Sequence, residues 1–136
     1  MTAYILDASA LIRYLDDAPG AERVEAIITE CLAGRAQSMI SAIQWGEVAL
    51  SVHKRFGASR VSKIMDRLAA AEIEVVPATR EQAMSAVDLK VGRGIPYSDA
   101  FSLDLAMKSS EHVLVTADHG LKIVKDLVRI EFLPAE

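Results

Sequence analysis

The sequence predicts an α/β fold with a mainly parallel central sheet. Short runs of aliphatic and β-branched residues alternate along the chain with longer stretches of helical periodicity, an order typical of a parallel sheet. Runs such as Tyr4-Ile5-Leu6 and Val113-Leu114-Val115 show no polar alternation, which favours strands buried on both faces. The 136 residues contain no repeat, linker or low-complexity segment. We therefore expect a single domain over residues 1–136.

The first half of the chain is expected to hold two strands and three helices. The turn sequence Asp17-Ala18-Pro19-Gly20 separates the first two helices, and Gly34 ends the second as a C-cap glycine does. Apolar residues follow helical spacing in the third helix until Phe56-Gly57 breaks it. The predicted elements are strand 3–7, helices 9–16 and 21–32, strand 38–40 and helix 42–55.

The second half continues the alternation. Pro77 ends a strand because proline has no N–H for the ladder, and Thr79 with Gln82 forms a capping box for the following helix. A Gly- and Pro-containing loop, residues 92–96, separates that helix from the next. The predicted elements are helix 59–71, strand 73–77, helix 80–91, helix 98–109, strand 113–116, a short helix after Asp118 and a strand near 129–132.

Composition narrows the classes of function. The formal net charge of −4 argues against a broad nucleic-acid-binding surface but is compatible with a nuclease whose acids hold metal. Cys31 is the only cysteine, so an intrachain disulfide is impossible and a cysteine-based zinc site is disfavoured. We expect a cytoplasmic protein without a signal peptide or a membrane segment.

Four acids stand out as candidate metal ligands. Asp7 and Asp118 end strands, and ligands bind at the carboxyl ends of strands in α/β sheets. Asp99 lies in the first turn of a helix, and Glu47 lies inside an otherwise apolar helix. Each has a simpler interpretation: Asp7 and Asp118 as caps or turn formers, Asp99 as a partner of the helix dipole, and Glu47 as a solvent-facing side chain.

The combination of the four acids is more informative than any one of them. Carboxylates gathered at one sheet edge repel each other, and no lysine or arginine follows these positions closely enough to neutralise each of them. A hard divalent cation with oxygen ligands resolves the repulsion, so Mg²⁺ or Mn²⁺ is the expected cofactor. Ser9, Thr116 and Ser98 lie beside these acids and are candidate supporting groups, with helix capping as the alternative for Ser9 and Ser98.

In these motifs the chain resembles PIN domains, in particular the small VapC-type ribonuclease toxins. The resemblance spans the chain and rests on four segments in order: residues 4–11, the segment 41–48 with Glu47, Tyr97-Ser98-Asp99-Ala100, and residues 114–118. It implies a three-layer α/β/α fold, divalent-metal-dependent RNA cleavage, a homodimer and a cognate VapB-type antitoxin. It makes Asp7, Glu47, Asp99 and Asp118 the acidic metal site. His119-Gly120 departs from the family pattern, which leaves the helix after Asp118 in doubt.

Several points stay open at the level of sequence. A non-catalytic PIN module that binds RNA or protein, and a PIN nuclease in housekeeping RNA processing, are the alternative functions. A dehalogenase-type phosphotransferase would need a second aspartate where Ser9 stands. The number of metal ions, the RNA target and the role of Glu47 as ligand or water-orienting group are undetermined. So are the roles of His119, Asp104 and the basic run from Lys54 to Lys63.

Overall fold

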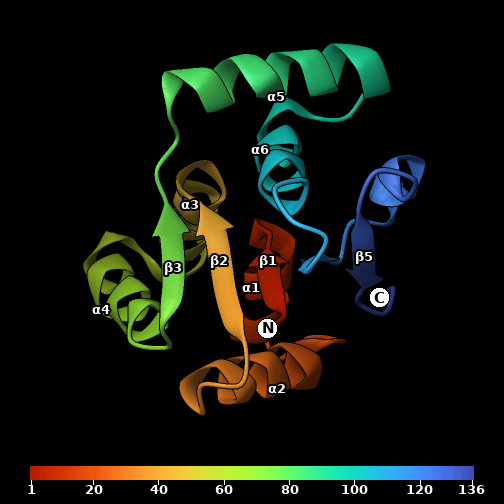
Figure 1. The fold of residues 1–136 in the computed structure, drawn as a ribbon. Coiled ribbons are helices and arrows are strands. Elements are labelled where there is room, and N and C mark those ends of the chain that lie inside the picture. Colours follow the sequence, from red (N-terminus) through yellow and green to blue (C-terminus); the bar gives the residue numbers. More distant parts are fainter.

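A computed structural model describes residues 1–136 and contains a five-stranded sheet in which every neighbouring pair is parallel. The strands lie in the order β3-β2-β1-β4-β5, so the first and fourth strands of the chain are neighbours in the sheet. Figure 1 labels β3, β2, β1 and β5, which follow one another across the view in this order. This confirms the predicted α/β class. The strands are β1 (Ala3–Leu6), β2 (Gln37–Ser41), β3 (Ile73–Val76), β4 (His112–Thr116) and β5 (Arg129–Phe132).

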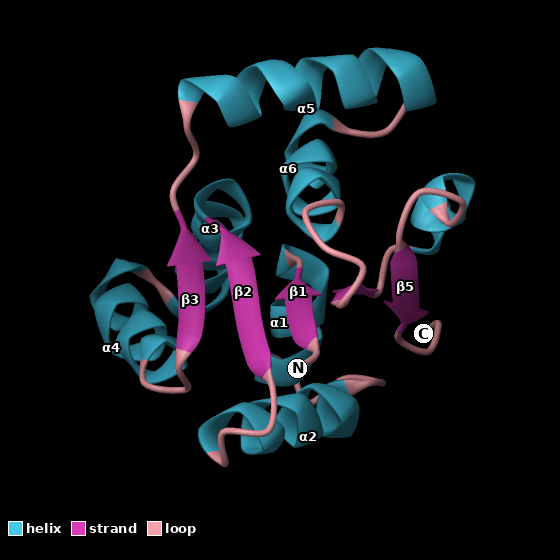
Figure 2. Ribbon diagram, viewed as in Figure 1, coloured by secondary structure: helices cyan, strands magenta, loops and turns pink.

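Helices cover both faces of the sheet, as the three-layer prediction requires (Figure 2). One core cluster lies between the sheet and the first four helices; the other lies between the sheet, the last two helices and a 3₁₀ helix. Neighbouring residues of β1 face opposite layers: Ile5 belongs to the second core and Leu6 to the first. The helices are α1 (Ala8–Leu15), α2 (Ala21–Leu32), α3 (Ala42–Phe56), α4 (Ala58–Ala69), α5 (Arg80–Arg93), α6 (Tyr97–Ala106) and the 3₁₀ helix η1 (His119–Val124).

The pairing of β1 with β4 determines where the chain leaves the sheet. Leu6 is opposite Val115 in the register, and the Asp7 backbone N–H donates to the Val115 carbonyl at 3.3 Å. The segments that follow these two strands therefore start side by side at the same edge of the sheet. The acids that end the strands, Asp7 and Asp118, are brought to that edge from opposite ends of the chain.

Several predicted helix boundaries and caps differ from the structure. Asp7, rather than Ser9, is the N-cap of α1. The N-cap of α6 is Pro96, so Ser98 is not a cap, and α6 ends at Ala106 rather than at residue 109. Thr79 caps α5 by accepting from the Gln82 N–H at 3.1 Å. The reciprocal half of the capping box is missing, because Gln82 Oε1 has no hydrogen-bond partner.

None of the helices combines the length and the apolar character that crossing a bilayer requires.

Candidate functional site

Asp7 is the most buried of the four predicted acids, with 2% of its surface exposed. Its Oδ1 accepts from the Ala10 N–H at 3.0 Å and from the Ser9 hydroxyl at 2.6 Å, while the Thr116 hydroxyl donates to Oδ2. Burial raises the pKa of Asp7, the three hydrogen bonds counteract it, and the charge of Asp118 raises it further. The interpretation of Asp7 as a helix N-cap is thus correct. The same side chain also lies close enough to the Asp118 carboxylate for its pKa to be affected.

Ser9 and Thr116 connect the two strand ends. The Ser9 hydroxyl donates to Asp7 and accepts from the Ala117 N–H at 2.8 Å, and the Thr116 hydroxyl accepts from the Asp118 N–H at 2.9 Å. The bond from the Ala117 N–H to Ser9 and the bond from the Thr116 hydroxyl to Asp7 cross from the end of β4 to the β1–α1 junction. Both side chains therefore lie where they were expected as supporting groups, and they fix the orientation of the Asp7 carboxylate.

Asp118 is exposed and lies at the start of η1. Its Oδ1 accepts from the Gly120 N–H at 2.9 Å, so it caps the turn that the simpler interpretation assigned to it. The predicted short helix after it is present as a 3₁₀ helix. One carboxylate oxygen remains free of intramolecular hydrogen bonds and is open to solvent.

Asp99, in the first turn of α6, responds to all three other acids. Its pKa is raised to about 6, first by burial and then by the negative charges of Asp7 and Asp118. Glu47 on α3 raises it as well, whereas a hydrogen bond from Gln44 lowers it. Because Coulombic interactions fall off with distance, the fold brings the four acids into one electrostatic cluster from four elements.

Glu47, like Asp118, is a solvent-facing member of this cluster. Its helix α3 buries Val48 and Val52, whereas Glu47 lies on the exposed face of the same helix. The solvent-facing alternative for Glu47 is therefore the correct one, because α3 turns its side chain outward. It still lies near enough to Asp99 to affect its pKa, on the wall of a groove that also includes Ala8.

Gln44 belongs to the site and was not singled out from the sequence. It is 1% exposed, and its Oε1 accepts from the Ala8 N–H at 2.7 Å. Its Nε2 donates to the Ser98 carbonyl at 2.9 Å and reaches Asp99 Oδ1 at 3.4 Å. Ser98 thus enters the site through its backbone carbonyl. The sequence signal that could have identified Gln44 is its position on the helix. It lies one helical turn before Glu47 and four residues before Val48, so it is on the same face of the helix as the buried Val48.

The four acids have no positive partner in the chain. None of them takes part in any ion pair of the structure. No three Asp, Glu, His or Cys side chains lie close enough together to hold a metal ion directly. The chemistry of the donor set nevertheless fits Mg²⁺, which prefers carboxylate oxygens and keeps several of its own waters, so some of these acids would contact the ion only through water.

Other residues singled out in the sequence lie outside the cluster. Asp104 is 7% exposed and lies 3.6 Å from Lys108 Nζ, farther along α6 from Asp99. His119 donates from Nε2 to the Leu133 carbonyl at 2.7 Å, and its ring packs against Phe132. The His119 ring therefore links η1 to the C-terminal segment of the chain.

Two arginines, Arg13 and Arg93, are bound to structural partners elsewhere in the chain. Arg13 donates to the carbonyls of Pro19 and Pro134, both at 2.7 Å, and so fastens the C-terminal segment. Arg93 forms two hydrogen bonds with Asp126, at 2.8 and 2.9 Å, linking the end of α5 to the segment after η1. Neither arginine neutralises the cluster.

Two basic residues, Lys54 and Arg55, share a groove with the site. The groove lies between α1 and α3 and is lined at one end by Ala8 and Glu47 and at the other by Lys54 and Arg55. Arg55 is paired with Asp16, whereas Lys54 takes part in no ion pair. Within the basic run, Lys54 is thus the unpaired cation on this groove.

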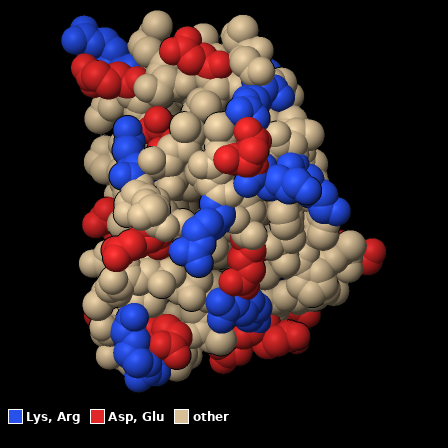
Figure 3. All heavy atoms as spheres, turned by 45° about the vertical axis from the view of Figure 1, so that its right-hand side comes forward, with Lys and Arg blue, Asp and Glu red and all other residues tan.

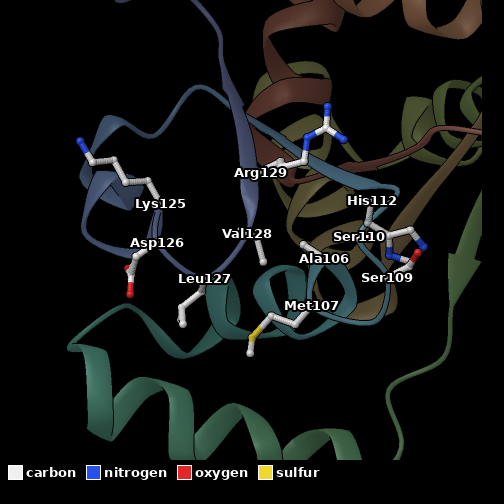
Figure 4. Close-up of a pocket in the computed structure, with 10 residues that line it drawn as sticks. All are labelled: Ala106, Met107, Ser109, Ser110, His112, Lys125, Asp126, Leu127, Val128 and Arg129. Carbon is white, nitrogen blue, oxygen red and sulfur yellow. The ribbon is translucent and has the colours of Figure 1, made fainter.

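A hollow of about 370 Å³ lies at the opposite edge of the sheet from the acids (Figure 4). Its lining includes His112 and Arg129, the first residues of β4 and β5, whereas the acids follow the carboxyl ends of strands. Figure 4 shows the side chains of Lys125 and Arg129 directed away from its centre. The hollow is therefore separate from the candidate site.

Comparison with known proteins places the chain in a family. The family model of the PIN domain matches residues 4–127. The chain belongs to the PIN domain family. No curated protein matches this PIN domain. Its fold is similar to a chain in the crystal structure of VapBC2 from Rickettsia felis bound to a DNA fragment from their promoter, with a TM-score of 0.73 and 17% identity over 98% of this chain and 100% of that one.

Two further structures show the same fold. A chain of the DNA-bound VapBC from Salmonella typhimurium has a TM-score of 0.68 and 16% identity, covering 97% of this chain and 98% of that one. A chain of a toxin–antitoxin complex from Klebsiella pneumoniae has a TM-score of 0.68 and 21% identity, covering 98% of this chain and 99% of that one.

Proposed function

We propose that this PIN domain is a divalent-metal-dependent ribonuclease that hydrolyses RNA phosphodiester bonds and acts as the toxin of a VapBC-type toxin–antitoxin pair. The observation that carries the nuclease proposal is the acid cluster. The negative charges of Asp7, Asp118 and Glu47 all raise the pKa of Asp99, and none of the four acids has a lysine or arginine partner. Such repulsion is costly unless the site receives a cation.

Asp7, Asp99, Asp118 and Glu47 would hold Mg²⁺, or Mn²⁺, partly through water. A bound divalent ion lowers the pKa of water and stabilises the charge that develops on a scissile phosphate. The chain itself supplies the orientation. Ser9 and Thr116 hold both oxygens of Asp7, and Gln44 holds the start of α6 that carries Asp99. Exposed Glu47 and Asp118 line the solvent side, where substrate and water enter.

The RNA substrate is expected to contact the protein at a few positions near the acid cluster rather than over a broad basic surface. Figure 3 shows Lys and Arg interspersed with Asp and Glu on the face it displays, without a broad basic patch. The net charge of −4 agrees with this. The groove that joins Glu47 to Lys54 offers one unpaired cation beside the acids. RNA therefore has a place for a phosphate next to the cluster, although most of the surface does not attract it.

Two macromolecular partners belong to the proposal. The toxin assignment is supported by the fold shared with VapBC complexes and implies a VapB-type antitoxin. An apolar groove of about 280 Å³, lined by residues of α1 and α4 that include Tyr14 and Ile64, is available to an apolar antitoxin segment. Met84, Val87 and Val91 expose an apolar stripe on α5 that suits a second copy of the chain. The molar mass in solution, alone and with the antitoxin, tests both expectations.

The nuclease proposal is tested with the purified chain, free of antitoxin. We expect RNA cleavage with Mg²⁺ or Mn²⁺ and none after chelation. Asp7→Asn should abolish cleavage, because it removes the charge of the innermost acid while keeping its shape and its hydrogen-bond acceptor. Asp66→Asn, at an exposed acid of α4, is the matched control.

Three outcomes would contradict the proposal or a part of it. Cleavage by Asp7→Asn at the parental rate would remove the cluster from the chemistry. RNA binding without cleavage in any divalent metal would instead favour the non-catalytic PIN module. If the chain cleaves RNA but no antitoxin-like partner suppresses it, a housekeeping nuclease becomes the better assignment.

A further inference from the structure

Gln44 is the side chain that joins the three helices around the acid cluster. It lies in the first turn of α3, contacts the first residue of α1 through the Ala8 N–H, and contacts the first turn of α6 through the Ser98 carbonyl. No other side-chain hydrogen bond of the structure connects α6 with α1 or α3. The acids Asp7 and Asp99 are the immediate neighbours of the two backbone groups that it holds.

The chemistry of an amide suits this position. A buried polar side chain costs free energy unless its donors and acceptors are satisfied, and Gln44 is 1% exposed with its oxygen and its nitrogen both engaged. The acceptor faces an N–H at the start of α1, and the donor faces a carbonyl and a carboxylate oxygen of α6. A carboxylate in place of the amide would lack the donor, and an apolar side chain would lack both groups.

These contacts fix a separation that the acids cannot fix themselves. Asp7 and Asp99 repel each other, as the raised pKa of Asp99 reflects. That repulsion favours a movement of the first turn of α6 away from the β1–α1 junction. Gln44 opposes that movement with hydrogen bonds of 2.7 and 2.9 Å to backbone groups, which cannot move without moving their helices.

We infer that Gln44 is a positioning residue, which sets the distance between the Asp7-bearing and Asp99-bearing elements so that one divalent cation engages both. This inference rests on the proposed metal-dependent nuclease. It assigns Gln44 no contact with substrate. Groups that orient metal ligands in this way typically change metal affinity or activity 10- to 100-fold (roughly) when they are removed.

The test replaces Gln44 by methionine, which matches its length but has neither donor nor acceptor strength. Gln82→Met is the matched control, because Gln82 is also a buried glutamine but its Oε1 has no hydrogen-bond partner. For each variant we would measure kcat and KM for RNA as a function of Mg²⁺, and the shift in melting temperature caused by Mn²⁺ alone. The second measurement needs no activity.

We expect Gln44→Met to raise the Mg²⁺ concentration for half-maximal activity by about 10-fold or more. The KM for RNA at saturating metal should stay near the parental value, and excess Mg²⁺ should restore part of kcat. The thermal shift with Mn²⁺ should require correspondingly more metal. Gln82→Met should match the parent in all of these quantities.

Unchanged metal dependence in a folded Gln44→Met variant would overturn the inference and leave Gln44 with a purely structural role. A change confined to the KM for RNA would also overturn it. If the methionine variant does not fold, Gln44→Glu decides: it keeps the acceptor for Ala8 but lacks the donor, so a parental metal dependence would again refute the inference. Failure of the proposed function is distinct, because the parent itself would then show no metal-dependent cleavage.

Discussion

Replacing Asp99 by asparagine should stabilise the metal-free protein and remove its response to divalent metal. The substitution keeps the size of the side chain and the oxygen that Gln44 Nε2 approaches, but it removes a negative charge next to Asp7, Asp118 and Glu47. Functional acids held together against their repulsion reduce the stability of the fold. Removing one of them should therefore increase the free energy of unfolding.

The magnitude follows from the pKa. Folding raises the pKa of Asp99 from 3.8 to about 6, and each unit corresponds to about 1.36 kcal/mol. The full shift would amount to roughly 3 kcal/mol, but Asp99 is only partly buried and water screens part of the repulsion. We therefore expect Asp99→Asn to gain about 1–2 kcal/mol at neutral pH.

The pH dependence has a definite sign. Because the folded pKa of Asp99 is higher than the unfolded one, the native state binds more protons than the unfolded state between them. The destabilisation is therefore absent below about pH 4, grows as the pH rises and is complete above about pH 6. The advantage of Asp99→Asn should be largest at neutral pH and vanish in acid.

Urea denaturation with chelator, at neutral pH and near pH 4, measures both differences, and Asp66→Asn controls for the loss of an exposed acid. Added Mg²⁺ should stabilise the parent, by about 2.7 kcal/mol at 100 times its dissociation constant, and should not stabilise Asp99→Asn. If Asp99→Asn is less stable than the parent at neutral pH, or responds equally to Mg²⁺, the account of a strained acid cluster is wrong.

Two further substitutions test the surroundings of the cluster. Thr116→Val removes the hydroxyl that donates to Asp7 and accepts from the Asp118 N–H. The free energy of unfolding at neutral pH, measured by urea denaturation, should therefore fall by about 1–3 kcal/mol. An unchanged value would show that these hydrogen bonds do not stabilise the fold. Lys54→Gln should weaken RNA binding and lower the slope of log affinity against log salt by about 1 unit, whereas Lys63→Gln on α4 should do neither. Equal effects of the two lysine variants would remove the groove from RNA binding.

Local signals in the sequence were sufficient for most of the secondary structure. The alternation of strands and helices predicted a parallel sheet, and all five strands appear close to their expected ranges. The wrong predictions concern the residues that cap the helices. Ser9 was a candidate cap for α1, but its hydroxyl accepts from the Ala117 N–H at the end of β4, and Asp7 caps the helix instead. A contact between residues so distant in the chain leaves no local pattern.

In the candidate site, too, long-range packing rather than local sequence decides where side chains lie. The sequence left open whether Glu47 is buried among its apolar neighbours or faces solvent, and the packing of α3 turns it to solvent. Gln44 was not singled out from the sequence, and it is buried between α1 and α6. Both outcomes depend on which face of α3 meets the other helices, and periodicity alone does not select that face when polar and apolar residues are mixed.

The sequence by itself determined that Asp7 and Asp118 would face one edge of a parallel sheet, because strand direction follows from the chain order and the carboxyl ends of parallel strands lie together. The tertiary structure decided how Asp99 and Glu47 join them and that Gln44 ties their helices together. Strand propensity and chain direction are local properties. The position of a helix over a sheet is set by packing between residues far apart in the sequence, and the acid cluster exists only once that packing is complete.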